Sequence, residues 1–307
     1  MNQTSKKTKM MIAGAIMLGM VAVANYPAFA QQQQRTPPTP LTERLLKAYM
    51  DLPAEQRKAE NKRFLEMYDG LRVADVRDGM DWYGYHHYGS VDPAVRPLWR
   101  TYAFGIARTA RYLPYVGPAP LERGAEYNRW QGMYYNEIAT YPWMDEIEEG
   151  DFIALDMSGV NVGLMGSENT LRCLARGSRG FILNGAGMRD TEEVIGSKIP
   201  VWNHFVSQAM DQARIQFDAK NVPVAIGGVT IFPGDIIVAD NDGVIVVPRS
   251  VAETVAKQAH RMLSTDMSAR RALYLQIGLE LDDSVKDVSI EERQAFYKKM
   301  GWDDMIR

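Results

Sequence analysis

An arginine beside an aspartate, Arg189-Asp190, is the strongest candidate for chemistry in this sequence. The pair follows a glycine-rich turn that begins at Gly185, directly after an apolar run typical of a buried strand. Such a turn before a short helix exposes backbone N–H groups, which suit a carboxylate or a phosphate. The forked guanidinium of Arg189 can grip a carboxylate with two hydrogen bonds, and Asp190 offers the hard oxygen ligands that Mg²⁺ prefers. The pattern indicates an anion site next to a divalent-metal site.

The same dipeptide has a plainer interpretation, in which the two side chains form a surface ion pair and Asp190 caps the next helix. A second candidate, the segment Gly163–Asn169, lies at the expected start of a helix. Glycine and small polar residues there favour an anion, because the N–H groups of a first helical turn lack partners within the helix. Ordinary capping by Ser167, with Glu168 in the favourable first turn, also explains this segment. Taken alone, each motif favours the structural interpretation.

Other patterns are weaker. The turn Asp240–Gly243 lacks the twelve-residue spacing of a calcium loop, so it predicts a hairpin turn. His86 and His87 are adjacent, so on a regular element their side chains point apart, which favours a pocket wall or an assembly contact over a shared metal. Cys173 is the only cysteine and lies in an apolar helical stretch, which predicts a buried spectator.

The first thirty residues are expected to be a cleaved signal peptide. Three lysines precede an apolar stretch from Met10 to Ala24, and Ala28-Phe29-Ala30 supplies a small-residue cleavage motif. The apolar stretch is shorter than the about 20 residues that a membrane span needs, which disfavours an uncleaved anchor. These features look bacterial. The mature chain is therefore predicted to be periplasmic or secreted, with no membrane attachment after cleavage.

The charge of the chain argues against a nucleic-acid partner. The formal net charge is −3, and loss of the signal peptide with its three lysines changes it to −6, with no basic block anywhere. Proteins that bind nucleic acids carry a basic footprint. A hydrophobic content of 46% over 307 residues is sufficient for one main domain with a full core and extensions.

The elements that must position these residues predict a mixed α/β core. Strands are expected over residues 100–113, 151–157, 180–183, 200–202, 215–217, 222–226, 236–239 and 244–247. The strand over 200–202 is expected at an edge of the sheet. Helices are expected over residues 39–52, 54–68, 71–82, 166–176 and 191–195, and in a long amphipathic run from 251. The first helix has Thr39 as its cap, and a last one begins at Ser289, where Glu292 completes a capping box.

The pattern along the chain divides it into five parts. The signal peptide covers 1–30, and a low-complexity stretch that is expected to be a disordered tether covers 31–38. A helical arm covers 39–70, the main domain 71–278, and a C-terminal helical extension 279–307.

Two long blocks together resemble the RraA-like family. The blocks are GSENTLRCLARGSRGFILNGAGMRDT, residues 166–191, and VPVAIGGVTIFPGDIIVADNDGVIVVP, residues 222–248. VADVRD near residue 75 and FGIARTA near residue 105 are weaker similarities, and the resemblance covers about 71–278. The family includes 4-hydroxy-4-methyl-2-oxoglutarate aldolases with oxaloacetate decarboxylase activity and the regulator of ribonuclease activity A. It implies a compact swivelling ββα domain, here with helices added at both ends, in a homotrimer or hexamer with sites between subunits.

The resemblance also implies roles for individual residues. A divalent metal, usually Mg²⁺, would be held by waters and Asp190, and Arg189 would bind the substrate and stabilise its enolate. The substrate carboxylate would be bound by four consecutive backbone amides, those of Gly166, Ser167, Glu168 and Asn169. A neighbouring subunit would supply an acidic group from its C-terminal helix, for which Asp266 is the candidate, with Arg270 one turn further on.

The implied activity is retro-aldol cleavage or decarboxylation of a small 2-oxo acid, such as 4-hydroxy-4-methyl-2-oxoglutarate or oxaloacetate, through a pyruvate enolate. The chain departs from the family pattern at three places: the turn before Arg189 is one residue longer, Asn184 replaces a common aspartate, and Ser167 replaces a usual glutamate. The alternative is a non-catalytic periplasmic protein with the same fold, which binds a small molecule or has a regulatory role. The signal peptide disfavours the ribonuclease-regulating role, because that ribonuclease is cytoplasmic.

Overall fold

The structure is a computed structural model that describes residues 41–120, 122–185, 187–286 and 289–306. From Thr42 to Arg307 the chain forms one compact unit. The expected signal peptide, the tether and the helix cap at Thr39 lie outside the described residues, so they stay predictions. The division of the remaining chain into arm, main domain and extension also stays a prediction.

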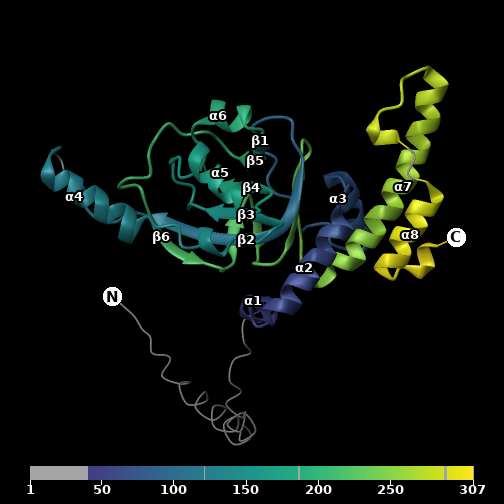
Figure 1. Ribbon diagram of the computed structural model, residues 1–307, viewed down its shortest axis with the longest axis horizontal. Coiled ribbons are helices and arrows are strands. Elements are labelled where there is room, and N and C mark those ends of the chain that lie inside the picture. The colour runs from purple at the N-terminus through teal and green to yellow at the C-terminus, as the bar shows by residue number, and fades with distance from the viewer. Residues whose placement is uncertain (1–40, 121, 186, 287–288, 307) are drawn as a thin grey trace, which may run out of the picture. The chain divides into compact units, whose positions relative to one another are not determined.

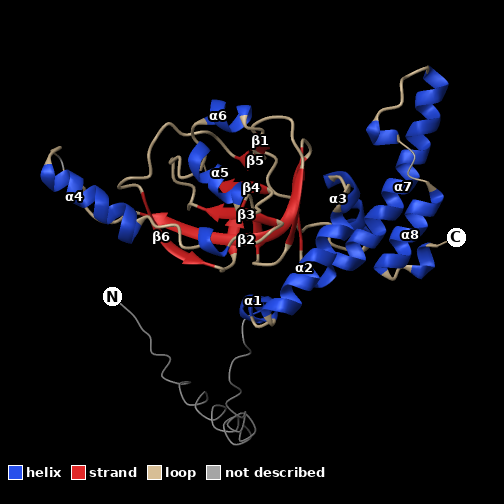
Figure 2. Ribbon diagram, viewed as in Figure 1, coloured by secondary structure: helices blue, strands red, loops and turns tan. Residues whose placement is uncertain are grey.

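The N-terminal helices agree with the sequence pattern. Helix α1 covers Leu41–Met50, α2 Ala54–Tyr68 and α3 Val73–Trp82. A further helical stretch was not predicted: α4, Ala125–Met133, continues into a π-helical turn η1, Tyr134–Ile138. Figure 2 shows α4 extending away from the strands.

Eight strands form one mixed sheet in the order β1-β5-β4-β3-β2-β9-β10, with β6 paired to β2 beside this path. Their bounds are Arg96–Pro97 for β1, Ala103–Pro114 for β2, Asp151–Asp156 for β3, Gly180–Asn184 for β4, Val201–Asn203 for β5, Ile215–Lys220 for β6, Ile236–Asp240 for β9 and Gly243–Val247 for β10. Strands β2, β3, β4 and β5 are parallel to one another, whereas β1, β6, β9 and β10 pair antiparallel. A separate hairpin joins β7, Val224–Ile226, to β8, Val229–Ile231.

The predicted strands are confirmed, with two corrections. Strand β5 was predicted to be an edge strand, but β1 pairs along its outer side through Arg96 and Pro97. The two-residue β1 is too short to leave a periodic signal in the sequence. Strand β8 was also not predicted, because its three residues follow the predicted β7 after only a tight turn. The turn Asp240–Gly243 is a hairpin, as predicted, since these two end residues pair across β9 and β10.

Successive residues of a strand face opposite sides of a sheet, and both sides of this one are covered. Ile153 and Leu155 of β3 face the side that is covered by α5, Ser167–Ala175, and α6, Thr191–Gly196. Phe152 of β3 and its same-face neighbours pack instead against the β7-β8 hairpin. The predicted mixed α/β core is therefore confirmed, and α5 and α6 are the connections between the parallel strands.

Helices α7, Ala252–Ile277, and α8, Ile290–Met300, pack with α2 and α3 over β9 and β10. The predicted capping box of α8 is present, because Ser289 and Glu292 exchange side-chain to backbone hydrogen bonds of 3.0 and 3.1 Å. Helix α3 approaches α7 closely at Gly79, where a Cβ would lie 2.8 Å from the Val255 carbonyl oxygen. No helix in the described ranges is both long and apolar enough to cross a membrane.

Candidate functional site

The candidate site lies where the four parallel strands end. Strands β2, β3, β4 and β5 run in the same direction, so the segments that follow them gather at one edge of the sheet. Met188, in the segment after β4, forms isolated bridges with Met165 after β3 and with Val206 after β5. In open α/β sheets this carboxyl edge is the usual place for a ligand. The predicted Arg-Asp motif therefore lies in the expected part of the fold.

Arg189 and Asp190 are brought against the start of α5. Arg189 Nε donates to Asp190 Oδ1 at 3.1 Å, and the Ser167 N–H donates to Asp190 Oδ2 at 3.2 Å. Asp190 has a left-handed backbone, with φ 55° and ψ 44°, which is uncommon for a residue other than glycine. Such conformations gather at functional sites. The structure thus joins the two sequence motifs, which are more than twenty positions apart, into one site.

Two glycines make this close approach feasible. A Cβ on Gly163 would lie 2.7 Å from Arg189 Cβ, and a Cβ on Gly166 would lie 2.3 Å from Asp190 Oδ2. The stem of Arg189 therefore lies along the backbone at Gly163, and the Asp190 carboxylate occupies the space that any side chain at Gly166 would take. The segment Gly163–Asn169 therefore contributes space for the side chains of Arg189 and Asp190 as well as N–H groups.

The first turn of α5 is open to an acceptor. Gly166 is the residue that precedes the helix, and it has no side chain that could cap the N–H groups. Three N–H groups come before the first intrahelical bond, which Thr170 N–H makes to the Gly166 carbonyl oxygen at 3.1 Å. That of Ser167 donates to Asp190, and those of Glu168 and Asn169 are left for an acceptor among the described contacts. The partial positive charge of a helix start adds to the charge of Arg189. The geometry suits a carboxylate.

The plainer interpretations of the two motifs are only partly correct. Arg189 and Asp190 do form an ion pair, but the Asp190 side chain makes no capping bond to α6, whose start it precedes. Ser167 is the first residue of α5 and makes no side-chain cap either. Capping therefore does not account for the residue types at these positions.

Asp190 fits a hydrated Mg²⁺ ion and does not fit a metal that needs several protein ligands. Its side chain is 35% exposed. Within the described part of the chain, no group of three or more His, Cys, Asp or Glu side chains could hold a metal ion. Mg²⁺ commonly takes one or two protein carboxylates and keeps several waters. The donor set suits such an ion with Asp190 as its protein ligand.

Asp266 is not brought to this site within one chain. It lies on α7, and its Oδ2 accepts from Arg72 Nη2 and from Arg270 Nε, both at 2.9 Å. Figure 1 shows α7 apart from α5 and α6. Arg270 and Arg72 also line a cavity of about 950 Å³ beside α7 and α8. The expected contribution of Asp266 from a neighbouring subunit stays a prediction.

Asn184 has a structural reason to differ from aspartate. At the ends of β4 and β3, Asn184 Nδ2 donates to Asp156 Oδ1 at 2.7 Å and to the Ala225 carbonyl oxygen at 3.1 Å. An aspartate at 184 would have no proton to donate in its charged form and would repel Asp156. The replacement of aspartate by asparagine at 184 is therefore explained by hydrogen bonds between the ends of β3 and β4.

A buried carboxyl that no sequence pattern marked, Asp211, lies at the same edge, in the segment after β5. The Tyr135 hydroxyl donates to Asp211 Oδ1 at 3.1 Å, and the Tyr141 hydroxyl donates to Oδ2 at 3.2 Å. Both tyrosines belong to the segment after β2, which contains the unpredicted α4 and η1. No motif marks these residues, because only the fold brings 135 and 211 together.

Electrostatics connect Asp211 to Arg189. Burial raises the pKa of the Asp211 carboxyl above its ordinary range, while the hydroxyls of Tyr135 and Tyr141 and the charge of Arg189 oppose this rise. Burial and the negative charge of Asp211 raise the pKa of Tyr135 to about 12, against the opposing charge of Arg189. The backbone places the two segments together, because Gly163, which lies against the stem of Arg189, donates its N–H to the Ala209 carbonyl oxygen at 2.9 Å, two residues before Asp211.

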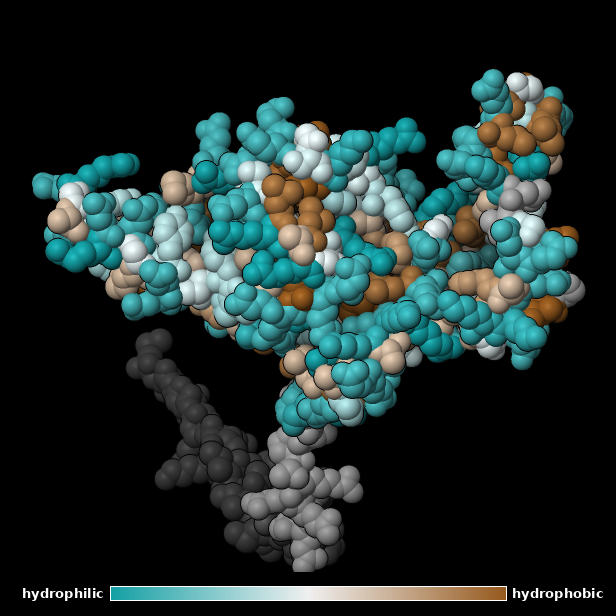
Figure 3. All heavy atoms as spheres, viewed as in Figure 1, coloured by the Kyte–Doolittle hydropathy of each residue, from teal (hydrophilic) through white to brown (hydrophobic). Residues whose placement is uncertain are grey.

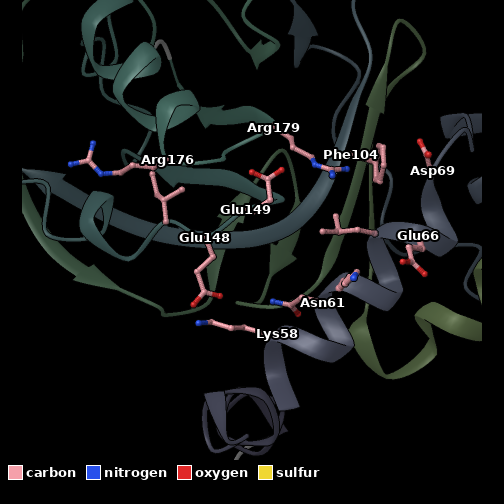
Figure 4. A pocket seen from close by; sticks show the side chains of 12 residues that line it. Lys58, Asn61, Glu66, Asp69, Phe104, Glu148, Glu149, Arg176 and Arg179 are labelled. Carbon is pink, nitrogen blue, oxygen red and sulfur yellow. The ribbon is translucent and has the colours of Figure 1, made fainter. Parts of the chain in front are cut away.

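A different cavity, of about 760 Å³, lies beside α2 and is lined by charges of both signs. Figure 4 shows Arg179 beside Phe104 and Lys58 beside Glu148. The Arg179 guanidinium lies 4.8 Å from the centre of the Phe104 ring, and Arg176 pairs with Asp145. These mixed charges show no preference for an anion, so the strand edge remains the better candidate.

The sequence resembles those of known proteins over much of its length. A sequence model of the RraA-like family, described as Aldolase/RraA, matches residues 73–246. A protein of Halalkalibacterium halodurans, provisionally named a 4-hydroxy-4-methyl-2-oxoglutarate aldolase, is 30% identical over 139 residues, which are 45% of this chain and 65% of that protein. Protein DlpA of Legionella pneumophila is 26% identical over 189 residues, 61% of this chain and 28% of DlpA. The match thus spans less than two thirds of either relative.

Solved structures agree with the fold. An uncharacterized protein from Pseudomonas syringae has a TM-score of 0.56 at 25% identity, over 73% of this chain and 98% of that one. Streptomyces coelicolor RraAS2, titled an unusual member of the RNase ES inhibitor RraA protein family, has a TM-score of 0.53 at 23% identity, over 67% of this chain and 95% of its own. The predicted RraA-like fold, with helices added at both ends, is confirmed.

Proposed function

The chain belongs to the RraA-like family, and from that premise we propose that it is a carbon–carbon lyase that cleaves a small 2-oxo acid. The aldolase names of relatives at about 30% identity support an aldolase of this family. The observation that carries the proposal is the convergence of the Arg189-Asp190 pair and the open first turn of α5 on one strand edge. This arrangement combines a carboxylate site with a cation beside it.

We propose that the first turn of α5 binds the substrate carboxylate through the N–H groups of Glu168 and Asn169, because the Ser167 N–H already donates to Asp190. Arg189 would then lie beside the keto oxygen of the bound 2-oxo acid. When the C–C bond next to the ketone breaks, its electron pair passes into an enolate, and negative charge grows on that oxygen. The guanidinium of Arg189 stabilises this charge, and the loss of one such donor typically slows turnover by about 10²–10³-fold.

The proposed cofactor is a divalent cation, Mg²⁺, held by Asp190 and waters. When bound, it would supply Lewis-acid stabilisation of the same developing charge. The chain's own contribution is the position of Asp190, which the Ser167 N–H and Arg189 hold at the edge of the site. The ion pair with Arg189 keeps the two groups together before substrate binds.

Assembly and location belong to the same proposal. Exposed apolar side chains gather at the end of α7, the brown area at the upper right of Figure 3, and include Leu273, Leu275 and Ile277. Exposed apolar patches commonly mark association surfaces, which supports a homotrimer or hexamer. In such an assembly Asp266 of one subunit would approach the Arg189 of another. The periplasmic or secreted location rests on the N-terminal sequence alone.

The competing function is a non-catalytic protein that binds a small molecule or regulates. The feature that separates the two is whether Arg189 and a divalent ion are needed for a reaction or only for binding. The terminal nitrogens of Arg189 make no hydrogen bond among the described contacts, so they could bind a ligand in an enzyme or in a binding protein. An activity measurement distinguishes the two functions.

The experiment is pyruvate release from oxaloacetate by the purified mature chain, residues 31–307, with Mg²⁺ and with EDTA. The rate with Mg²⁺ alone is subtracted, because the free ion decarboxylates oxaloacetate by itself. We expect release that requires Mg²⁺ and that falls at least about 10²-fold in Asp190→Asn. Release at the background rate in the wild type, with binding of oxaloacetate intact by calorimetry, would favour the binding protein instead.

A further inference from the structure

The segment after β2 reaches the Arg189 site through its π-helical turn. Ala139 N–H bonds to the Tyr134 carbonyl oxygen at 2.8 Å, which closes the wider turn of η1. This turn directs two successive hydroxyls to Asp211, that of Tyr134 to its carbonyl oxygen and that of Tyr135 to its carboxylate. Single π-helical turns are frequent at functional sites. All four parallel strands therefore send a segment to this edge, not only the two that carry the family motifs.

Asp211 differs from Asp235, a second described carboxyl that is buried without a direct cation. Asp235 Oδ2 accepts from the Phe232 N–H at 2.9 Å, and Oδ1 accepts from the Arg249 N–H at 3.1 Å. Backbone donors of this kind fix a turn. Both Asp211 oxygens accept instead from phenol hydroxyls, which can rotate and can accept a proton as well as donate one. Asp211 is thus built for exchange of a proton with its neighbour.

The two phenols are not equivalent. Tyr141 packs against Tyr112 and Trp143 in the core. Tyr135 is half-buried at the edge, and it is the phenol on which the charge of Arg189 acts. Of the two phenols that donate to Asp211, Tyr135 is therefore the one on the Arg189 side.

We propose that Tyr135 and Asp211 move the proton that retro-aldol cleavage requires, with Tyr135 as the group that touches the substrate and Asp211 as the positioning residue that holds the proton behind it. This inference rests on the proposed function and deepens it. It assigns the site to substrates that carry a hydroxyl on the carbon beyond the cleaved bond. It also gives the unpredicted segment after β2 a role in the reaction.

The proton balance closes within the two side chains. The C3–C4 bond of a 4-hydroxy-2-oxo acid breaks, its electron pair forms the enolate, and the C4 hydroxyl becomes a carbonyl by losing its proton. That proton passes to the Tyr135 oxygen while the Tyr135 proton passes to the Asp211 carboxylate. The transfer then runs in reverse, and the proton ends on C3 of the enolate to give pyruvate. No other reactant is consumed.

Burial raises the pKa of Asp211 above its ordinary range, which is the direction that suits a carboxyl acting as a proton carrier. The titratable and charged groups that face Asp211 are Tyr112, Tyr134, Tyr135, Tyr141 and Arg189. Burial raises the pKa of each of these four tyrosines, so they stay neutral while Asp211 titrates.

The test compares two reactions at the same site. Cleavage of 4-hydroxy-4-methyl-2-oxoglutarate requires removal of a hydroxyl proton, whereas decarboxylation of oxaloacetate does not. In Tyr135→Phe and Asp211→Asn we expect kcat for cleavage to fall about 10²–10⁴-fold and kcat for decarboxylation to fall less than about tenfold. Tyr135→Phe removes a single oxygen atom and is therefore expected to fold. It tests the proposal by itself if Asp211→Asn does not fold.

Matched controls separate proton transfer from general damage. Tyr141→Phe removes the other hydroxyl that donates to Asp211, and Asp235→Asn removes a buried carboxyl outside the site. Both should keep the wild-type ratio of cleavage to decarboxylation. In the wild type, kcat for cleavage should rise with pH as Asp211 ionises, through a limb above the ordinary carboxyl range. This limb should be absent in Asp211→Asn.

The outcomes are distinct. A wild-type ratio and an unchanged pH profile in both Tyr135→Phe and Asp211→Asn would overturn the inference and leave the lyase intact. Selective loss of cleavage in Asp266→Asn, with the other two variants unaffected, would overturn it in favour of an acid from a second subunit. A wild-type protein inactive on both substrates would remove the proposed function, and this inference with it.

Discussion

Two arginine–carboxylate pairs, Arg63–Glu253 and Arg189–Asp190, differ in how much of their hydrogen-bonding capacity the chain itself uses. Arg63, on α2, donates through both terminal nitrogens to both oxygens of Glu253 on α7, at 2.7 and 2.6 Å, and also to the Met300 carbonyl oxygen at 3.1 Å. Arg189 makes one hydrogen bond among the described residues, from Nε to Asp190. Their exposure is similar, 46% for the Arg63 side chain and 34% for that of Arg189.

This difference separates a structural pair from a pair that can serve a ligand. The Arg63 pair joins three helices, and a ligand would have to break bonds that the fold already makes. The terminal nitrogens of Arg189 are available, and the adjacent start of α5 offers N–H groups to the same region. Exposure and residue type are alike, so unused hydrogen-bonding capacity is what identifies the site.

The largest expected effect comes from removing each arginine in turn. Arg189→Ala should lower turnover about 10³-fold, because it deletes the cation beside the developing enolate. Arg63→Ala should leave turnover unchanged and lower the free energy of unfolding by roughly 0.2–1 kcal/mol, as for an exposed ion pair. Steady-state kinetics measure turnover in both variants, and urea unfolding measures their free energies of unfolding. Equal losses of turnover in the two variants would show that the Arg189 pair is no more catalytic than the Arg63 pair.

A smaller effect is expected from two glycines that allow close approach. Gly166→Ala would place a Cβ 2.3 Å from Asp190 Oδ2, and the backbone φ of −118° accepts alanine. The carboxylate must move, so turnover should fall by about 10²-fold with little change in stability. Gly79→Ala would meet the Val255 carbonyl oxygen at 2.8 Å and should instead destabilise the fold by about 1–3 kcal/mol.

Kinetics and thermal unfolding of the two glycine variants distinguish these effects. The reverse pattern, an inactive Gly79→Ala that unfolds normally and an active but unstable Gly166→Ala, would show that the helical region is the reactive one.

The smallest effect concerns Cys173, on the same helix as Ser167 but facing the sheet. The cysteine is fully buried, and burial raises the pKa of its thiol to about 12, in agreement with the predicted spectator role. Cys173→Ala should cost roughly 1 kcal/mol of stability and leave kcat unchanged. A loss of turnover in this variant, at temperatures where it stays folded, would mean that α5 transmits core packing to the site.

Sequence was sufficient where the signal is local. The bounds of α2 and the Ser289–Glu292 capping box follow from propensity and short-range hydrogen bonds, and both are confirmed. The RraA-like fold was also accessible, because two long motif blocks carry the central strands. The grouping of Arg189 with Ser167 agrees with the expectation from the family.

Sequence was insufficient where contacts are distant or helical geometry is unusual. The π-helical turn at Tyr134–Ile138 has no periodic signature, and Asp211 has no motif, because its partners lie about seventy residues before it. The two-residue β1 is defined only by its pairing with β5. These features depend on the order of strands in the folded sheet.

The central claim is that the strand edge around Arg189 binds a 2-oxo acid. Its most direct test is calorimetric binding of oxalate, a planar mimic of the pyruvate enolate, to the mature chain in the presence of Mg²⁺. We predict binding in the wild type and in Arg63→Ala, and at least about tenfold weaker binding in Arg189→Ala, since a charged hydrogen bond is lost. Unchanged oxalate affinity in Arg189→Ala would contradict the account.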